Sequence, residues 1–253
     1  MKLRLDQLLV RRGLVESRER AQALIMAGQV DLDGRAAAKA GTMVSEHADV
    51  KVIGPDHPWV SRGGVKLAHA LDAFGLDVTG RVGLDVGAST GGFTDVLLAR
   101  GAAPVFAVDV GHGQLHWRLR NDPRVTVIEG VNARHLSRDH LPTLQDGARI
   151  VTIDVSFISL ALILPPLLGL VATDADLVAL VKPQFEAGRR DAPRGVVRDP
   201  AVHARVLAEI TAKAAAIGWS RLAATPSPIV GAKGNREFLV HFRPAGGPLN
   251  APC

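Results

Sequence analysis

The spacing of apolar residues divides the chain into a small amino-terminal part and a larger remainder. Residues 1–55 contain two amphipathic helical patterns and two short strand patterns, at 30–34 and 50–53. The apolar helical faces consist of Leu5, Leu8 and Leu9 in the first helix and Ala21, Leu24 and Ile25 in the second. Ser17 is a typical N-cap for the second helix, and Gly28 ends it. Together these patterns predict a compact α+β module.

In the larger remainder, short apolar runs alternate with amphipathic stretches. Strands are predicted at 82–86, 105–109, 125–129, 150–154, 177–181, 221–225 and 237–242. Helices are predicted from Gly64 to Phe74 and at 92–100, 113–120, 158–171 and 200–217. This alternation is typical of an α/β fold with a mostly parallel, doubly wound sheet, which binds ligands at the carboxyl ends of its strands.

These patterns also predict where the parts of the chain begin and end. We expect the module at 1–55, a linker at 56–62, the larger domain at 63–243 and a disordered tail at 244–253. Residues 155–173 lack charge and have the length of a membrane span, but two prolines interrupt them and no basic residue flanks them. We therefore predict a buried helix there and no membrane partner. The first residues carry charges inside their apolar stretch, unlike a signal peptide, which favours a cytoplasmic protein.

Charge adds the possibility of a polyanionic partner. The formal net charge is +5, and basic residues are dense near the amino terminus, where Arg4, Arg11, Arg18 and Arg20 lie. RNA fits this charge, but a solvated helix face without a ligand is an open alternative. Cys253 is the only cysteine, so the sequence excludes a disulfide framework and a Cys-ligated metal site.

A loop of small residues joins the strand at 82–86 to the helix at 92–100. Gly87, Gly91 and Gly92 leave backbone N–H groups uncovered at the start of a helix, which suits a polar or anionic cofactor. The next strand ends in Asp109, a position from which a carboxylate can bind a cofactor ribose. A nicotinamide dehydrogenase is one reading, but the glycine that its fingerprint requires is replaced by Ser89.

Four charged residues stand out because apolar or small residues surround them. Asp154 and Lys182 each end an apolar strand, Glu237 opens the last strand, and Lys66 lies near the start of a helix. Each of them alone could be a strand-end charge that faces water. An acid and a lysine at neighbouring strand ends, beside a glycine-rich loop, favour a functional site.

Taken together, the motifs resemble the TlyA (hemolysin A) family of ribosomal-RNA 2′-O-methyltransferases, which is part of the FtsJ-like methyltransferases. The resemblance rests on SRGG at 61–64 with Lys66, LDVGASTGGFT at 84–94, VDVG at 108–111 with GQL at 113–115, NAR at 132–134, IDVSFIS at 153–159, LVKPQFE at 180–186, GVVRDP at 195–200 and GNREF at 234–238. Residues 3–53 resemble the small alpha-L, or S4-type, RNA-binding domain.

The resemblance implies a Rossmann-like class I methyltransferase fold, with a seven-stranded sheet and S-adenosylmethionine as cofactor. It places a catalytic tetrad on Lys66, Asp154, Lys182 and Glu237. It places cofactor contacts on Asp85, Gly87, Ala88, Ser89, Thr90, Gly91, Gly92, Phe93, Asp109, Val110, Asn132 and Ala133. RNA contacts are expected at Arg4, Arg11, Ser17, Arg18 and Arg20.

The implied reaction methylates the 2′-hydroxyl of a cytidine in ribosomal RNA and needs no metal. The chain resembles the short form of the family, which acts on the large ribosomal subunit; modification of the small subunit is the alternative. A 2′-hydroxyl is a poor nucleophile until it shares its proton, and we expect Lys182 to orient and deprotonate it. Asp154 and Glu237 would hold Lys182 and Lys66 in place. A cytolysin and a non-catalytic RNA-binding assembly factor are alternatives of a different class.

Overall fold

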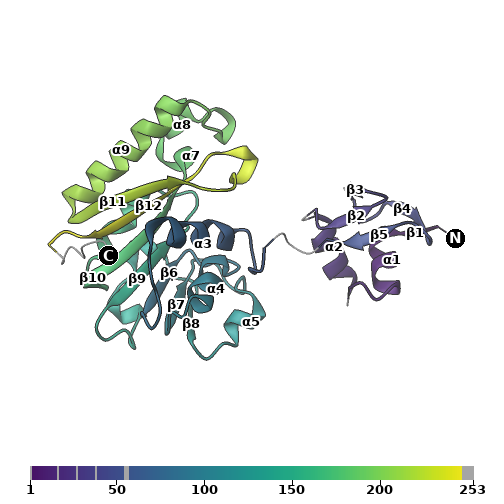
Figure 1. Cartoon of the computed structure of the whole chain (residues 1–253), viewed down its shortest axis with the longest axis horizontal. Helices are drawn as coiled ribbons and strands as arrows, with labels where there is room; N and C mark the ends of the chain where they lie inside the picture. The colour runs from purple at the N-terminus through teal and green to yellow at the C-terminus, as the bar shows by residue number, and fades with distance from the viewer. Residues whose placement is uncertain (1, 16, 27, 38, 54–56, 247–253) are drawn as a thin grey trace. The chain divides into compact units, whose positions relative to one another are not determined.

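The computed structural model describes residues 2–15, 17–26, 28–37, 39–53 and 57–246. The chain forms two compact units, Met1–Pro58 and Trp59–Cys253 (Figure 1). Each unit buries its own apolar residues, so each has a separate hydrophobic core.

The small unit combines two helices with short strands around one core. Its elements are β1 (Lys2–Arg4), α1 (Leu5–Arg11), α2 (Arg18–Met26), β2 (Val30–Leu32), β3 (Arg35–Ala36), β4 (Met43–Ser45) and β5 (Val50–Val52). Strands β3, β2 and β5 form an antiparallel sheet, and β1 pairs with β4. The predicted cap of α2 is confirmed, because the backbone N–H of Arg20 donates to Ser17 Oγ over 3.1 Å. The β1–β4 pair escaped prediction because three-residue strands carry almost no periodicity.

The large unit is built on a seven-stranded sheet in the order β11-β12-β10-β9-β6-β7-β8. Its strands are β6 (Gly83–Val86), β7 (Val105–Val108), β8 (Val125–Ile128), β9 (Ala148–Ile153), β10 (Val171–Val181), β11 (Trp219–Pro226) and β12 (Phe238–Pro244). Strands β6 to β10 run parallel, whereas β12 is antiparallel to both of its neighbours. This confirms the predicted mostly parallel, Rossmann-like sheet.

Helices cover both faces of this sheet (Figure 1). They are α3 (Gly63–Phe74), α4 (Gly92–Ala99), α5 (Trp117–Arg120), α6 (Leu164–Leu167), α7 (Pro183–Glu186), α8 (Gly188–Asp191) and α9 (Pro200–Ala216). Helices α3 and α4 share one apolar core with the sheet, and α6 and α9 share the other. The start predicted for α9 is confirmed: Asp199 Oδ1 accepts from the backbone N–H of Ala201 over 2.8 Å, and Pro200 is the first helical residue.

The predicted helix at 158–171 is wrong. A 3₁₀ turn at Leu160–Leu162 and the single turn of α6 occupy that stretch, and β10 already begins at Val171. Pro165 and Pro166 have no backbone N–H to donate, so they are tolerated only in the first turn of a helix, which is where they lie in α6. Of the helices in the described residues, none is both long and apolar enough to span a bilayer.

Two further boundaries differ from prediction. The helix expected at 113–120 is restricted to Trp117–Arg120, because the preceding loop contains Gly113 in a left-handed conformation (φ 66°). The predicted start of the tail, residue 244, is too early, because Pro244 is still the last residue of β12. Residues 247–253 lie outside the described part of the chain.

Candidate active site

The four predicted catalytic residues meet at the carboxyl edge of the parallel strands. Asp154 directly follows β9 and Lys182 directly follows β10, whereas Glu237 directly precedes β12. In the antiparallel pair of β10 and β12, Val181 faces Phe238, which places the next residues, Lys182 and Glu237, beside each other. The fold therefore gathers residues that are far apart in the sequence.

Two short ion pairs organise these side chains. Lys66 Nζ lies 2.5 Å from Glu237 Oε2, and Lys182 Nζ lies 2.5 Å from Asp154 Oδ1. Lys182 Nζ also donates to Ser156 Oγ over 2.9 Å. The two lysine side chains are only 11% and 10% exposed, so their charges are not simply solvated at strand ends. Burial of a charge without a partner is costly, and each lysine has a carboxylate to offset it.

The start of α3 packs directly on the start of α4. A Cβ atom on Gly92 would lie 2.2 Å from Ser61 Oγ and 2.9 Å from the backbone nitrogen of Gly64. A Cβ atom on Gly63 would lie 3.8 Å from Asp154 Oδ2. Glycine at these positions lets two helix N-termini approach each other and brings α3, which carries Lys66, beside Asp154.

The glycine-rich loop after β6 also needs its glycines for steric reasons. Gly87 has φ 85°, and a Cβ atom there would lie 2.6 Å from the carbonyl oxygen of Asp154. Gly91 has φ 96° and begins α4. Ser89 and Thr90 at the tip of the loop are exposed, whereas Ala88 is buried. The loop thus presents only small side chains at its tip.

Asp109 shapes this loop from the neighbouring strand. Its Oδ2 atom accepts from the backbone N–H of Ser89 over 2.8 Å, and its Oδ1 atom accepts from that of Gly111 over 2.7 Å. The backbone N–H of Val131 donates to the carbonyl oxygen of Asp109, which brings the loop after β8 to the same place. That loop carries Asn132, whose Oδ1 atom accepts from the backbone N–H of Arg134 over 3.1 Å.

We expect Asp109→Ala to weaken binding of S-adenosylmethionine about 10- to 100-fold, as loss of a charged hydrogen-bonding partner does. The substitution removes both a candidate ribose ligand and the acceptor that holds Ser89. Isothermal titration calorimetry measures the effect, with the exposed acid Asp139→Ala as control. Equal affinity in the wild type and Asp109→Ala would leave Asp109 as a strand-end charge.

Asp85 and Phe93, two of the expected cofactor residues, are buried below the glycine-rich loop. Asp85 is fully buried, and its two carboxylate oxygens accept from Thr94 Oγ1 (2.6 Å) and Thr152 Oγ1 (2.8 Å). Phe93, in the first turn of α4, is 3% exposed and packs in the core that α3 and α4 share with the sheet. The geometry supports a positioning role for both residues: Asp85 ties β6 to α4 and β9, immediately below the glycine-rich loop.

Burial raises the pKa of Asp85 to about 6, against the hydrogen bonds from Thr94 and Thr152, which lower it. Between about pH 4 and pH 6 the folded state therefore holds a proton that the unfolded state has lost, and stability falls as the pH rises through this window. Asparagine cannot titrate, so we compare the wild type with Asp85→Asn. As the pH rises from about 4 to about 6, the unfolding free energy of the wild type should fall by about 3 kcal/mol relative to that of the variant. Urea denaturation of both proteins from pH 4 to pH 8 measures the difference. A constant difference would contradict the raised pKa.

Phe157 lies next to this site, but the sequence did not predict a role for it. Its side chain is 91% exposed, and its φ of 64° is rare for a bulky residue. It follows Ser156, the hydrogen-bonding partner of Lys182, and its ring lies 5.0 Å from that of Phe185. Glu186 fixes the far end of the loop by accepting from Ser159 Oγ (2.6 Å) and from the backbone N–H of Leu160 (2.8 Å). An exposed aromatic ring thus stands on the loop whose Ser156 holds Lys182.

In the small unit, a buried acid organises the expected RNA contacts. Asp6 is fully buried and accepts from Arg4 Nε and Nη2 (3.0 and 2.9 Å) and from Arg18 Nη2 (3.4 Å). The hydrogen bonds from Arg4 hold the pKa of Asp6 well below its usual range. Arg11 Nη1 lies 3.7 Å from Glu46 Oε2, whereas Arg20 has no ionic partner within the described ranges. Arg4 and Arg18 are thus oriented by Asp6, and Arg11 lies beside Glu46.

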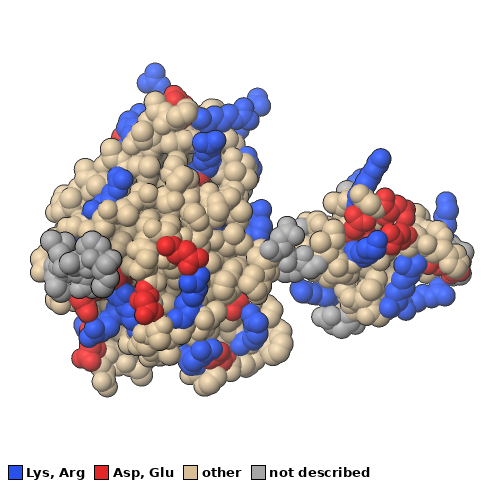
Figure 2. Space-filling view, in the orientation of Figure 1, with Lys and Arg blue, Asp and Glu red and all other residues tan. Residues whose placement is uncertain are grey.

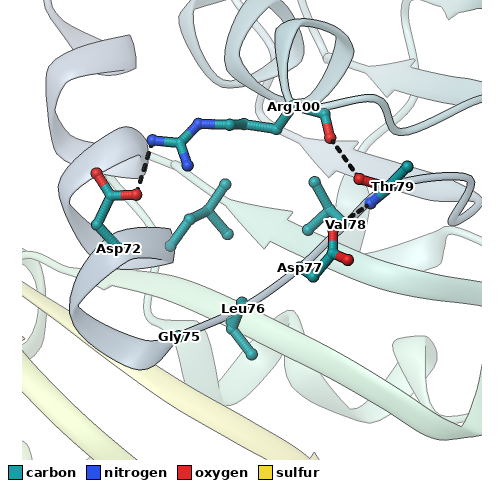
Figure 3. Close-up of a pocket in the computed structure, with 8 residues that line it drawn as sticks. Asp72, Gly75, Leu76, Asp77, Val78, Thr79 and Arg100 are labelled. Carbon is teal, nitrogen blue, oxygen red and sulfur yellow. Dashed lines mark hydrogen bonds and ion pairs between the residues drawn. The ribbon is translucent and has the colours of Figure 1, made fainter.

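A separate hollow at the other edge of the large unit adds nothing to this site. It lies between the ends of α3 and α4, and it is lined by Leu71, Asp72, Gly75, Leu76, Asp77, Val78, Thr79 and Arg100 (Figure 3). Its charged groups are already paired, with Arg100 Nη2 lying 2.7 Å from Asp72 Oδ1. No cluster of His, Cys, Asp and Glu suited to a metal ion occurs in the part of the chain that the structure describes.

Comparison with protein families divides the chain at the same place as its fold. Residues 59–244 match the FtsJ-like methyltransferase family, and residues 3–50 match the S4 domain. The two matches coincide with the large and the small unit.

Individual proteins are similar over nearly the whole chain. The 16S/23S rRNA (cytidine-2′-O)-methyltransferase TlyA of Mycobacterium tuberculosis is 50% identical over 95% of this chain and 89% of that protein. Hemolysin A of Brachyspira hyodysenteriae is 40% identical over 95% of this chain and 99% of that protein. A solved structure from Streptococcus thermophilus that carries the hemolysin name superposes with a TM-score of 0.76, at 44% identity, over 98% of this chain and 90% of that one.

Proposed function

Because the chain belongs to the FtsJ-like methyltransferase family and carries an S4 domain, we propose that it transfers a methyl group from S-adenosylmethionine to the 2′-hydroxyl of a cytidine in ribosomal RNA. The observation that carries this proposal is the pair of buried lysine–carboxylate ion pairs at the carboxyl edge of the sheet. We assign the substrate to the large ribosomal subunit and the reaction to the cytoplasm, where that subunit is found. The family match excludes the nicotinamide dehydrogenase reading.

The loop after β6 fits S-adenosylmethionine. Ser89 and Thr90 are exposed at the tip of the loop, and Asp109 supplies a carboxylate for ribose hydroxyls. Asn132 and Ala133 lie on the loop that hydrogen-bonds to Asp109 and would contact the adenine side. When bound, S-adenosylmethionine supplies an electrophilic methyl group on a positively charged sulfur.

Lys182 is placed to receive the proton of the attacking hydroxyl. Ser156 Oγ accepts from its Nζ atom over 2.9 Å, and Asp154 Oδ1 lies 2.5 Å from the same atom, so these two oxygens orient the amine. As general base, the amine in its unprotonated form takes the proton of the 2′-hydroxyl on Nζ while the hydroxyl oxygen takes the methyl group. Lys66 is held by Glu237, which lies beside Lys182 in the β10–β12 pair, so the two ion pairs form one cluster.

Phe157 gives the site a surface for the target base. Bases stack on exposed aromatic rings with an energy of about 1–3 kcal/mol each. The ring lies on the loop from Ser156 to Ser159, and Ser156 accepts from Lys182 Nζ, so a cytidine stacked on the ring would present its ribose towards Lys182.

We expect Phe157→Ala to lower kcat/KM for ribosomal RNA roughly ten- to hundred-fold, mainly through KM, because it removes one stacking contact. Phe157→Trp restores an aromatic surface and should recover most of the activity. Steady-state methyl transfer at varied RNA concentration separates the two parameters. An unchanged KM in Phe157→Ala would rule out base stacking on this residue.

The proposed function is tested by methyl transfer in vitro. The full chain is incubated with labelled S-adenosylmethionine and with large or small ribosomal subunits that lack 2′-O-methyl cytidine, and the labelled nucleotide is mapped. A 2′-O-methyl cytidine in the large subunit supports the proposal. RNA binding without methyl transfer would favour an assembly factor, and leakage of liposomes by the purified protein would favour a cytolysin.

A further inference from the structure

Two basic turns lie next to each other at the edge of the catalytic tetrad. Arg194 precedes Gly195, and Lys233 precedes Gly234; all four residues have positive φ angles, of 57° and 76° in the first turn and 57° and 79° in the second. Positive φ is natural for glycine but rare for arginine and lysine. Each turn thus holds a long cationic side chain on a backbone that such residues seldom adopt.

Asn235 fastens the two turns together. It is 2% exposed, its Nδ2 atom donates to the carbonyl oxygen of Gly195 (2.9 Å), and its Oδ1 atom accepts from the backbone N–H of Val197 (3.0 Å). Its own carbonyl oxygen accepts from the backbone N–H of Gly231 over 2.8 Å. A buried amide that joins two loops by several hydrogen bonds fixes their relative position.

This arrangement places the cationic side chains of Arg194 and Lys233 on adjacent turns. Lys233 Nζ would lie 3.8 Å from a Cβ atom on Gly195, next to Arg194. Arg198 and Arg236 flank the residues that Asn235 joins, and all four cations are exposed. Within the described ranges none of the four has an ion-pair partner; the nearby acid Asp191 is paired with Arg205. Mutual repulsion makes this cluster unfavourable unless an anion lies against it.

The cationic surface adjoins the tetrad through the same loop. A Cβ atom on Gly231 would lie 2.0 Å from Glu237 Oε1, so the loop packs directly on the partner of Lys66. Figure 2 shows basic side chains gathered at the end of the large unit that carries α8 and the β11–β12 connection. In RNA, the ribose that presents its 2′-hydroxyl is joined to phosphates on both sides. A strand whose hydroxyl reaches Lys182 must therefore run its phosphates past the neighbouring surface.

We propose that Arg194, Arg198, Lys233 and Arg236, held by Asn235, form a second RNA-binding surface that grips the phosphates flanking the target nucleotide. This inference rests on the proposed function, since it takes ribosomal RNA as the substrate. It assigns to the large unit an RNA-binding surface of its own, in addition to that of the S4 domain. Phosphate contacts of this kind fix the register of a strand and carry no sequence information.

The test is the salt dependence of binding to 23S ribosomal RNA transcribed in vitro. The full-length double variant Arg194→Gln with Lys233→Gln is compared with Arg149→Gln with Arg221→Gln. The control pair loses the same charge at the amino ends of β9 and β11, away from the site. Each lost phosphate contact flattens the slope of log affinity against log salt by about 0.7–0.9. We expect the test pair to flatten it by about 1.5 and to raise KM, with affinity for S-adenosylmethionine and the limiting kcat retained.

If the slope of log affinity against log salt is the same in the test pair and the control pair, the second RNA-binding surface is overturned. Methylation by the wild type would in that case still support the proposed function. Failure of the wild type to bind or methylate ribosomal RNA would overturn both. Thermal melting of each variant verifies that the fold is intact.

Discussion

Replacing Lys182 by alanine should reduce the rate of methyl transfer about 10²- to 10⁴-fold, the usual loss when a positioned general base is removed. The side chain carries the only amine that contacts both Asp154 and Ser156 among the described residues. Affinity for S-adenosylmethionine should stay within a few-fold of that of the wild type, because the loop at 87–92 and Asp109 are untouched. Single-turnover methylation of large ribosomal subunits measures the effect.

An exposed lysine on α9 provides the matched control: Lys213→Ala should turn over at the wild-type rate. Ser156→Ala removes one of the two groups that hold Lys182 and should give an intermediate loss. Turnover of Lys182→Ala near that of the wild type would show that another group removes the proton. Calorimetry with S-adenosylmethionine confirms in each case that the cofactor site is intact.

Removing residues 1–58 should strongly reduce methylation of ribosomal RNA while leaving S-adenosylmethionine binding intact. The remaining unit begins at Trp59 and keeps both of its own apolar cores, so we expect it to fold alone. Without the S4 domain, the RNA loses one of two linked binding modules, which typically costs about 10²–10⁴-fold in avidity. We expect kcat/KM to fall by that factor.

Adding residues 1–58 as a separate protein distinguishes tethering from folding. The small unit has its own core, and in trans it should not restore activity, because the gain comes from the covalent link. Filter binding at several salt concentrations should show a flatter slope for the truncated enzyme. Equal RNA affinity and activity in the full and truncated chains would make the S4 domain dispensable.

Helices bounded by capping or helix-breaking residues could be predicted from the sequence. Helix α4 is enclosed by glycines, and α9 begins at Asp199 and Pro200, so the expected ranges agree with the structure. The uncharged run at 155–173 could not be resolved, because continuous apolar residues fit a buried strand as well as a helix. The early start of β10 at Val171 depends on pairing with β9, which is a tertiary contact.

The site shows the same division. Strand ends and the glycine-rich loop pointed to Asp154, Lys182 and Asp109, since parallel strands share one carboxyl edge. The resemblance assigns Lys66 and Glu237 to the tetrad, but only the fold shows that they pair with each other. Phe157 was missed because a phenylalanine in an apolar run is usually buried, and its exposure depends on an unusual φ angle.

The ion pair between Lys66 and Glu237 joins residues separated by 171 positions. Lys66 is among the first residues of the large unit to be synthesised, and Glu237 is among the last. During translation, a nascent chain with its last strand still inside the ribosomal exit tunnel holds the glycine-rich loop but lacks a closed tetrad. The ion pair therefore forms only after the last strand of the sheet has left the tunnel and paired with β10.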